Sequence, residues 1–169
     1  MKKVYLVGFM GSGKSAVGKR LTPLVNMPFY DMDAEIVKMI GMTIPQIFET
    51  YGEEGFRDIE TEFLKTFPDE YCIIATGGGV PMRAENRELM KSSGLVFYLN
   101  STFRDIWRRV STDPNRPIVQ KSTREELEIL FNKRKAYYMK SAHFKVETTN
   151  RSLHEISQYV AFQINRLKG

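Results

Sequence analysis

The residues from Gly8 to Ser15 constrain this chain more than any other stretch. They read G-F-M-G-S-G-K-S and fit the pattern G-x-x-x-x-G-K-[ST] of a phosphate-binding loop. An apolar run of β-forming residues, 4–7, precedes the loop, and a segment that can start a helix, 16–21, follows it. A phosphate-binding loop requires this order of strand, loop and helix. The sequence therefore predicts nucleotide binding, and the loop alone leaves open whether the protein is a kinase, an ATPase or a GTPase.

Backbone geometry explains why this pattern binds phosphate. Glycines let the backbone adopt conformations that other residues avoid, so several N–H groups can converge on one anion. The helix that follows adds the positive end of its dipole. Lys14 can reach the β- and γ-phosphates, and the Ser15 hydroxyl can ligate Mg²⁺. We therefore expect the nucleotide phosphates to be bound by Gly11, Ser12, Gly13, Lys14, Ser15 and Ala16.

The rest of the chain alternates between strand-like and helix-like segments. Apolar runs at 4–7, 28–30, 72–75, 95–99 and 144–147 predict five strands. Helical periodicity and capping patterns predict helices near 16–25, 34–40, 43–51, 53–67, 83–91, 102–109, 123–140 and from 152 onward. This alternation is typical of an α/β fold with a parallel sheet. We expect one domain over 1–169, with a small helical insertion near 33–65 and a mobile, polar lid near 111–122.

Composition bounds the partners and the compartment. Lys and Arg number 25 against 20 Asp and Glu, which favours an anionic partner. Because the basic residues are scattered, a small phosphate- or carboxylate-bearing ligand explains this balance as well as nucleic acid does. No apolar run approaches the ~20 residues of a membrane span. The N-terminus lacks signal-peptide features, and Cys72 is the single cysteine. We expect a cytoplasmic protein without a membrane or nucleic-acid partner.

Two carboxylates follow the second predicted strand, where ligands gather in parallel sheets. Asp31 and Asp33 alternate with Met32, so an extended backbone would place both carboxylates on one face. A magnesium ion needs hard oxygen ligands, and a kinase that acts on an alcohol needs a group to orient its hydroxyl. Asp31 near the metal and Asp33 near the substrate would serve both needs. The alternative is that Asp33 only caps the next helix.

Three consecutive glycines, Gly77, Gly78 and Gly79, follow the third predicted strand. Ordering three glycines costs conformational entropy, and a plain turn gains nothing from the third. We favour backbone N–H groups that face a substrate, and the alternative is a tight connection from strand to helix.

Three arginines are candidates for anion binding, although each alone is more typical of a solvated surface. Arg57 lies in a helical segment with Phe48 and Phe56, and Glu60 at i+3 could orient it. Arg116 lies within the predicted lid, and Arg134 lies on the helix that follows it.

Taken together, these motifs resemble the shikimate kinases over nearly the whole chain. The resemblance rests on an ordered series: G-F-M-G-S-G-K-S (8–15), D-M-D (31–33), G-E-E-G-F-R-D-I-E (52–60), T-G-G-G-V-P (76–81), N-R (86–87), N-R-P (115–117) and R-K-A-Y-Y (134–138). It implies a nucleoside-monophosphate-kinase-like fold with strand order 2-3-1-4-5. It also implies a cytoplasmic enzyme, expected to be monomeric, that transfers the ATP γ-phosphate to the 3-hydroxyl of shikimate, a step toward chorismate and the aromatic amino acids.

The resemblance also implies roles for individual residues. Lys14 and Ser15 would serve phosphate and Mg²⁺, Asp31 would hold the metal, and Asp33 would contact the shikimate hydroxyls as the candidate base. The remaining implied roles are a carboxylate clamp (Arg57, Arg134), backbone contacts to shikimate (Gly77, Gly78, Gly79), walls around its ring (Phe48, Phe56), a phosphate contact from the lid (Arg116) and adenine contacts (Arg109, Arg151). Near Arg151 the chain departs from the family, because Ser152-Leu153 replaces a frequent Asn-Pro.

Two other functions fit parts of the pattern. A related small-molecule kinase, for gluconate or a nucleoside monophosphate, would share the loop but would not need the arginine pair with D-x-D. A nucleotide-dependent regulatory protein would need a nucleotide-sensing segment and usually a guanine-specificity motif, and no N-K-x-D sequence is present.

Overall fold

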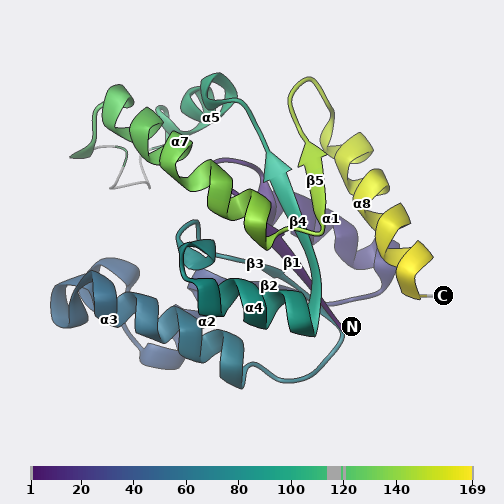
Figure 1. Cartoon of the computed structure of the whole chain (residues 1–169), viewed down its shortest axis with the longest axis horizontal. Coiled ribbons are helices and arrows are strands. Elements are labelled where there is room, and N and C mark those ends of the chain that lie inside the picture. Colours follow the sequence, from purple (N-terminus) through teal and green to yellow (C-terminus); the bar gives the residue numbers. More distant parts are fainter. Residues whose placement is uncertain (1, 114–118, 120, 169) are drawn as a thin grey trace.

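The computed structural model describes residues 2–113, 119 and 121–168 (Figure 1). Five parallel strands form one sheet in the order β2-β3-β1-β4-β5, which confirms the predicted order. They are β1 (Lys3–Val7), β2 (Phe29–Asp31), β3 (Cys72–Ala75), β4 (Gly94–Asn100) and β5 (Phe144–Glu147). The helices are α1 (Lys14–Val25), α2 (Met32–Ile40), α3 (Ile44–Thr66), α4 (Ala84–Ser93), α5 (Phe103–Val110), α7 (Arg124–Ser141) and α8 (Leu153–Lys168), with a 3₁₀ turn η1 (Val80–Met82).

Helices cover both faces of the sheet, giving the expected α/β/α layers. One apolar core packs α1 and α8 against the sheet, with Leu21 and Val160 fully buried. The other core draws Phe63, Met90 and Tyr138 from α3, α4 and α7. Figure 1 shows α4 and α7 in front of the sheet and α1 behind it. Burial on both faces explains why β1 and β3 read as continuous apolar runs in the sequence.

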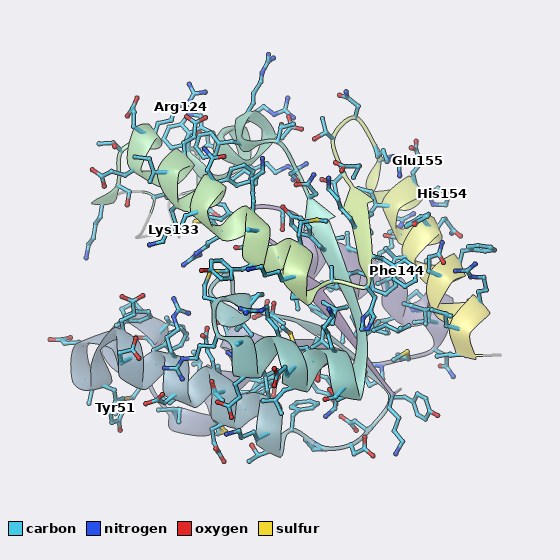
Figure 2. The ribbon with its side chains drawn as sticks, viewed as in Figure 1. Tyr51, Arg124, Lys133, Phe144, His154 and Glu155 are labelled. Carbon is cyan, nitrogen blue, oxygen red and sulfur yellow. The ribbon has the colours of Figure 1, made fainter. Side chains whose placement is uncertain are left out.

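The helical insertion predicted near 33–65 consists of α2 and α3. The predicted break at Gly52 is present, because this residue has φ 72° and ψ 179° inside α3. Thr43 and Gln46 form the predicted capping box at the start of α3. Figure 2 shows Tyr51 at the outer edge of this helix, where its side chain is 52% exposed. Half of the predicted lid, 114–118 and 120, lies outside the described residues.

Within the described ranges, none of the helices is both long and apolar enough to cross a membrane.

Gly18 sets how closely α1 approaches the edge strand β2. A Cβ atom at this position would lie 2.2 Å from Cε2 of Phe29. Overpacking of a well-filled core costs about 1–3 kcal/mol, whereas Gly→Ala within a helix otherwise gains up to about 1 kcal/mol. We predict that Gly18→Ala lowers the free energy of unfolding by about 1–2 kcal/mol, because the clash exceeds the gain. Urea unfolding measures this change.

The same substitution in a Phe29→Ala background is the control. Without the ring, Gly18→Ala should be neutral or stabilising, since only helix propensity remains. Equal destabilisation in both backgrounds would show that Phe29 is not the cause.

Candidate active site

The loop between β1 and α1 wraps around the lysine that follows it. Lys14 Nζ donates to the carbonyl oxygens of Gly8 and Phe9, at 2.7 and 3.0 Å. Gly11 has φ +76°, and a Cβ there would lie 2.6 Å from a methyl carbon of Val110. A residue with a side chain could not hold this conformation in this space. The glycine at this position is therefore a requirement of the loop's shape.

A first cavity of about 460 Å³ opens at this loop. Its walls come from the phosphate loop, the ends of β2 and β3, and α5. The lining residues are Met10, Gly11, Gly13, Lys14, Ser15, Ala16, Asp31, Asp33, Ala75, Thr76, Gly77, Gly78 and Arg109. The cavity lies at the carboxyl ends of parallel strands, where ligands of open α/β sheets bind.

Ser15 and Asp31 bring two hard oxygen atoms together in this cavity. The Ser15 hydroxyl donates to Oδ2 of Asp31 at 2.9 Å. Oδ1 of the same carboxylate accepts from the Ala34 amide at 3.2 Å, so Asp31 caps α2. A hydroxyl and a carboxylate beside a phosphate loop fit the donors that Mg²⁺ prefers.

The geometry at Asp33 differs from the sequence-based expectation. The alternation argument assumed extended backbone through Asp33, but α2 already begins at Met32. Asp31, and not Asp33, is the N-cap, so the capping alternative for Asp33 was wrong as well. Asp33 lies in the first helical turn and still lines the first cavity together with Asp31. The two carboxylates thus meet through the cap geometry and not through a shared strand face.

A second cavity of about 620 Å³ adjoins the first. It lies between α2, α3, the glycine loop and α7. The lining residues are Met10, Asp33, Ile44, Pro45, Phe48, Phe56, Arg57, Glu60, Gly77, Gly78, Gly79, Lys121, Leu130 and Arg134. Met10, Asp33, Gly77 and Gly78 line both cavities. Asp33 therefore lies at the junction between them.

Arg57 and Glu60 form a buried ion pair in the second cavity. Arg57 Nη1 donates to Oε2 of Glu60 at 2.8 Å, and the side chains are 15% and 1% exposed. Arg57 also lies 3.8 Å from Glu53 and over the ring of Phe56. The predicted i+3 orientation of Arg57 by Glu60 is present. These contacts fix the guanidinium while leaving it on the cavity wall.

The glycine loop fits against the charged groups without side chains of its own. A Cβ on Gly79 would lie 2.4–2.5 Å from the guanidinium of Arg57. A Cβ on Gly77 would approach carboxylate oxygens of Glu60 and Asp33 at 3.0 and 3.1 Å, and one on Gly78 would lie 3.3 Å from Arg134 Nη1. The loop backbone, both arginines and both carboxylates therefore converge on one small region.

Aromatic rings complete the walls. Phe48 and Phe56 pack with ring centroids 4.7 Å apart, and both line the second cavity. The Arg134 guanidinium lies over the ring of Phe9, 5.9 Å from its centroid. A cavity with apolar walls and a few convergent polar groups is typical of a small-molecule site.

Burial changes the ionisation of both carboxylates in this region. Desolvation raises the pKa of Asp33, and the charge of Asp31 adds to the rise, while Lys14 and Arg57 oppose it. Desolvation raises the pKa of Glu60 to about 7, against the opposing charge and hydrogen bond of Arg57. Perturbed carboxylates in a cavity are typical of functional sites.

The remaining residues named from the sequence fall in different places. Arg109 lines the first cavity and donates to the Gly11 carbonyl at 2.9 Å. Ser12, within the loop, is buried and is not among the described residues that line the first cavity. Arg151 lies exposed in the turn between β5 and α8, and among the described residues it is not one that lines either cavity. Arg116 lies outside the described residues.

Sequence reasoning missed several lining residues. Met10 lies inside the loop pattern at a position where any residue is allowed, so the motif gave no signal for it. Leu130 and Lys121 reach the second cavity from α7 and from the segment before it. The spacing of Leu130 and Arg134, one helical turn apart, could have placed both on one face.

Comparison with known proteins gives the family. The shikimate kinase family model matches residues 10–165. A shikimate kinase from Nitrosospira multiformis is 44% identical over 163 residues, which cover 95% of this chain and 84% of the relative. One from Enterococcus faecalis is 37% identical over 97% of this chain and 99% of its own. The solved structure of a shikimate kinase from Acinetobacter baumannii in complex with shikimate superposes with a TM-score of 0.90 at 37% identity, covering 99% of this chain and 95% of that one.

The chain belongs to the shikimate kinase family. The part matched by the family model includes every charged residue of the two cavities, from Lys14 to Arg134. The match to the family is therefore not limited to the phosphate loop and spans both cavities.

Glu60 makes the stability of this shikimate kinase family member depend on pH. Its pKa rises from 4.5 to about 7 on folding, so folding favours the protonated form. The stability gained is fully present below about pH 4.5 and is lost as pH rises through about 7, by roughly 3 kcal/mol. Glu60→Gln resembles the neutral form at every pH. We predict that the unfolding free energy of wild type, relative to Glu60→Gln, falls by about this amount between pH 4.5 and 8.

Urea unfolding of both proteins across this range measures the difference. Glu88→Gln, at an exposed position of α4, is the matched control and should give a nearly constant difference from wild type. A wild-type advantage over Glu60→Gln that grows with pH would contradict the assignment.

Proposed function

We propose that this protein transfers the γ-phosphate of ATP to the 3-hydroxyl of shikimate, giving shikimate 3-phosphate and ADP on the route to chorismate and the aromatic amino acids. The observation that carries the proposal is the pair of adjoining cavities that share Asp33. One has the phosphate loop as its wall, and the other has two arginines. A phosphoryl donor and a carboxylate-bearing alcohol can thus bind side by side.

The first cavity suits the triphosphate. The amides of the phosphate loop and the start of α1 attract anionic oxygens. Lys14 supplies a positive charge at the loop, and Arg109 lies beside Gly11, where adenine contacts are expected. We assign Mg²⁺ to Ser15 and Asp31, because their oxygens lie 2.9 Å apart at the mouth of the loop. Bound there, the ion would neutralise charge on the β- and γ-phosphates.

The second cavity suits shikimate. Arg57 and Arg134 offer two guanidinium groups, which bind a carboxylate through charge-assisted, bidentate hydrogen bonds. The backbone of the glycine loop can bond the hydroxyl groups, and Phe48 and Phe56 can contact the faces of the ring. The fixed Arg57–Glu60 pair lowers the entropic cost of binding, because the guanidinium is already held in place.

Asp33 is the group we assign to the acceptor hydroxyl. It lies where the two cavities meet, so its carboxylate can accept a hydrogen bond from a hydroxyl that points at the γ-phosphate. Its raised pKa makes it a better proton acceptor than an ordinary aspartate. Phosphoryl transfer otherwise needs positioning and charge neutralisation more than covalent chemistry.

We also retain the wider proposals made from the sequence. The chain acts as one domain over 1–169, with its substrate region near 33–65 and a lid near 111–122 that brings Arg116 onto the transferring phosphate. Closure of such a lid would exclude water and suppress ATP hydrolysis. We propose a cytoplasmic monomer with no nucleic-acid or membrane partner; the scattered basic residues support the absence of a nucleic-acid partner.

The geometry favours this acceptor over those of related kinases. A nucleoside monophosphate would need a pocket for its base, whereas two arginines and two carboxylates line the second cavity and suit an acceptor that carries a carboxylate and hydroxyl groups. A purely regulatory protein would have no use for this acceptor cavity.

Acceptor-dependent turnover is the direct test. With ATP and Mg²⁺, shikimate should raise the rate of ADP release at least about tenfold over ATP alone, because the acceptor completes the site. Gluconate and nucleoside monophosphates at equal concentration should not. Asp33→Asn should lower turnover strongly, whereas Asp58→Asn, at an exposed position of α3, should leave turnover unchanged. No shikimate-dependent ADP release from folded protein would sink the proposal.

Arg57 tests the carboxylate assignment. Arg57→Ala should weaken shikimate binding about 100-fold, the loss expected for charged hydrogen bonds of roughly 3 kcal/mol. ATP binding should change less than about twofold, because Arg57 lies outside the first cavity. Isothermal titration calorimetry measures both affinities and counts the competent sites.

Arg83→Ala is the matched control for this substitution. Arg83 pairs with Glu54 and Asp58, which lie on α3 as Arg57 does. It is not among the described residues that line the second cavity. It should leave shikimate affinity unchanged. An equal loss of ATP and shikimate binding in Arg57→Ala would contradict the assignment.

A further inference from the structure

A buried tyrosine ties α7 to the glycine loop. Tyr138 is 0% exposed, and its hydroxyl donates to the carbonyl oxygen of Gly78 at 2.8 Å. It lies four residues after Arg134, one helical turn along α7, so both side chains leave the helix on the same face. The two side chains therefore reach the glycine loop together, and only one of them bears the charge that a substrate would meet.

Gly78 lies between these two groups. A Cβ placed on Gly78 would lie 3.3 Å from Arg134 Nη1 and 3.7 Å from the Tyr138 hydroxyl oxygen. The guanidinium, the phenol and the loop backbone thus form one contact. Movement of the loop would change its distance from Arg134, and the hydrogen bond of Tyr138 opposes that movement.

The planar peptide bond between Gly78 and Gly79 links the Tyr138 hydrogen bond to the orientation of the Gly79 N–H. The carbonyl of Gly78 and the N–H of Gly79 belong to one planar, trans peptide unit, so they point in opposite directions. Holding the oxygen toward Tyr138 turns the N–H away from α7. Gly79 itself lies close to the guanidinium of Arg57, since a Cβ placed on it would lie 2.4 Å from Nη1. The Tyr138 hydroxyl therefore fixes the orientation of the Gly78–Gly79 peptide, which lies beside Arg57. It also fixes the distance between the glycine loop and Arg134.

A separate group holds the next part of the loop. Asn86, which is fully buried, donates through Nδ2 to the carbonyl of Val80 at 2.9 Å. The Thr61 hydroxyl in turn bonds Oδ1 of Asn86 at 2.8 Å. The Val80 end of the loop is thus held against α3 and α4, while Tyr138 holds the Gly78–Gly79 peptide against α7.

We propose that Tyr138 is a positioning residue for the acceptor, which fixes the Gly78–Gly79 peptide between Arg134 and Arg57 without touching the substrate itself. This inference rests on the proposed function, because the acceptor is the carboxylate-bearing alcohol assigned to the second cavity. The role belongs to the hydroxyl and not to the ring.

The phenol is a dependable donor for this purpose. Burial raises the pKa of Tyr138 well above its usual value, and the nearby charge of Arg134 opposes only part of the rise. The hydroxyl therefore keeps its proton throughout the range in which the enzyme can be assayed.

Tyr138→Phe removes the hydroxyl and keeps the ring. We expect the KM for shikimate to rise about fivefold to tenfold, the effect of losing one well-placed hydrogen bond from the binding site. The KM for ATP should change less than about twofold, because the phosphate loop is untouched. KM does not depend on the amount of active enzyme, so a partly folded preparation still decides the question.

Two other buried tyrosines provide matched controls. The hydroxyl of Tyr98 donates to Oδ1 of Asn100 at 2.9 Å, and that of Tyr5 bonds Ser93 at 2.9 Å. Tyr98→Phe and Tyr5→Phe lose a buried hydroxyl in the same way and should leave both KM values unchanged, even where they lower the melting temperature. Tyr138→4-aminophenylalanine, which returns an N–H donor to the same place, should restore the KM for shikimate.

The outcomes separate this inference from the proposed function. If wild type shows no shikimate-dependent ADP release, the proposed function fails first. If wild type turns over shikimate and Tyr138→Phe keeps its KM for shikimate, Tyr138 has no positioning role. Equal rises in the two KM values, or the same effect in Tyr98→Phe, would reduce Tyr138 to a structural residue.

Discussion

The second cavity depends on a guanidinium group that is nearly buried and held in one orientation. Arg57 meets that demand through a carboxylate at 2.8 Å on its own helix, with an aromatic ring beneath it. Removing charges from water is costly, and the bond from Arg57 to Glu60, itself 1% exposed, offsets part of that cost. The absence of a Cβ at Gly79 lets the loop backbone approach the same group. The guanidinium of Arg57 thus has a carboxylate partner, a nearly buried position and close contact with the glycine loop, and the other groups of the second cavity lie around it.

The two cavities share a carboxylate whose pKa responds to the charges around it. Asp33 lies on the wall common to both cavities, within reach of the fields of Lys14 and Arg57. Its desolvation and the neighbouring Asp31 favour the neutral form, while the two cations favour the charged one. Anything that adds or removes charge in either cavity therefore acts on the same carboxylate. This arrangement links the ionisation of Asp33 to the occupancy of both sites.

Local sequence patterns predicted the helices and strands, but they could not predict contacts between residues far apart in the chain. The phosphate loop, the apolar strands and the break at Gly52 depend on neighbouring residues, so the sequence indicated them directly. Asp31 and Asp33 were paired for the wrong reason, because a helix cap replaced the assumed extended backbone. Arg57 and Gly79 lie far apart in the chain, and composition cannot distinguish such an arginine from a solvated one. The residues alone offered Arg57 as one of three candidate arginines, and the resemblance to a family gave it a role. For Arg151 the resemblance indicated a contact that the described cavities do not include.

The common wall of the cavities has a consequence for inhibitor design. Met10, Asp33, Gly77 and Gly78 border both spaces, so the two cavities are direct neighbours. A bisubstrate compound that joins an adenosine phosphate to a carboxylated ring would need only a short tether. Short tethers keep the effective concentration of the second group high. Such a compound would also engage the arginine pair, which a mimic of the nucleotide alone cannot reach.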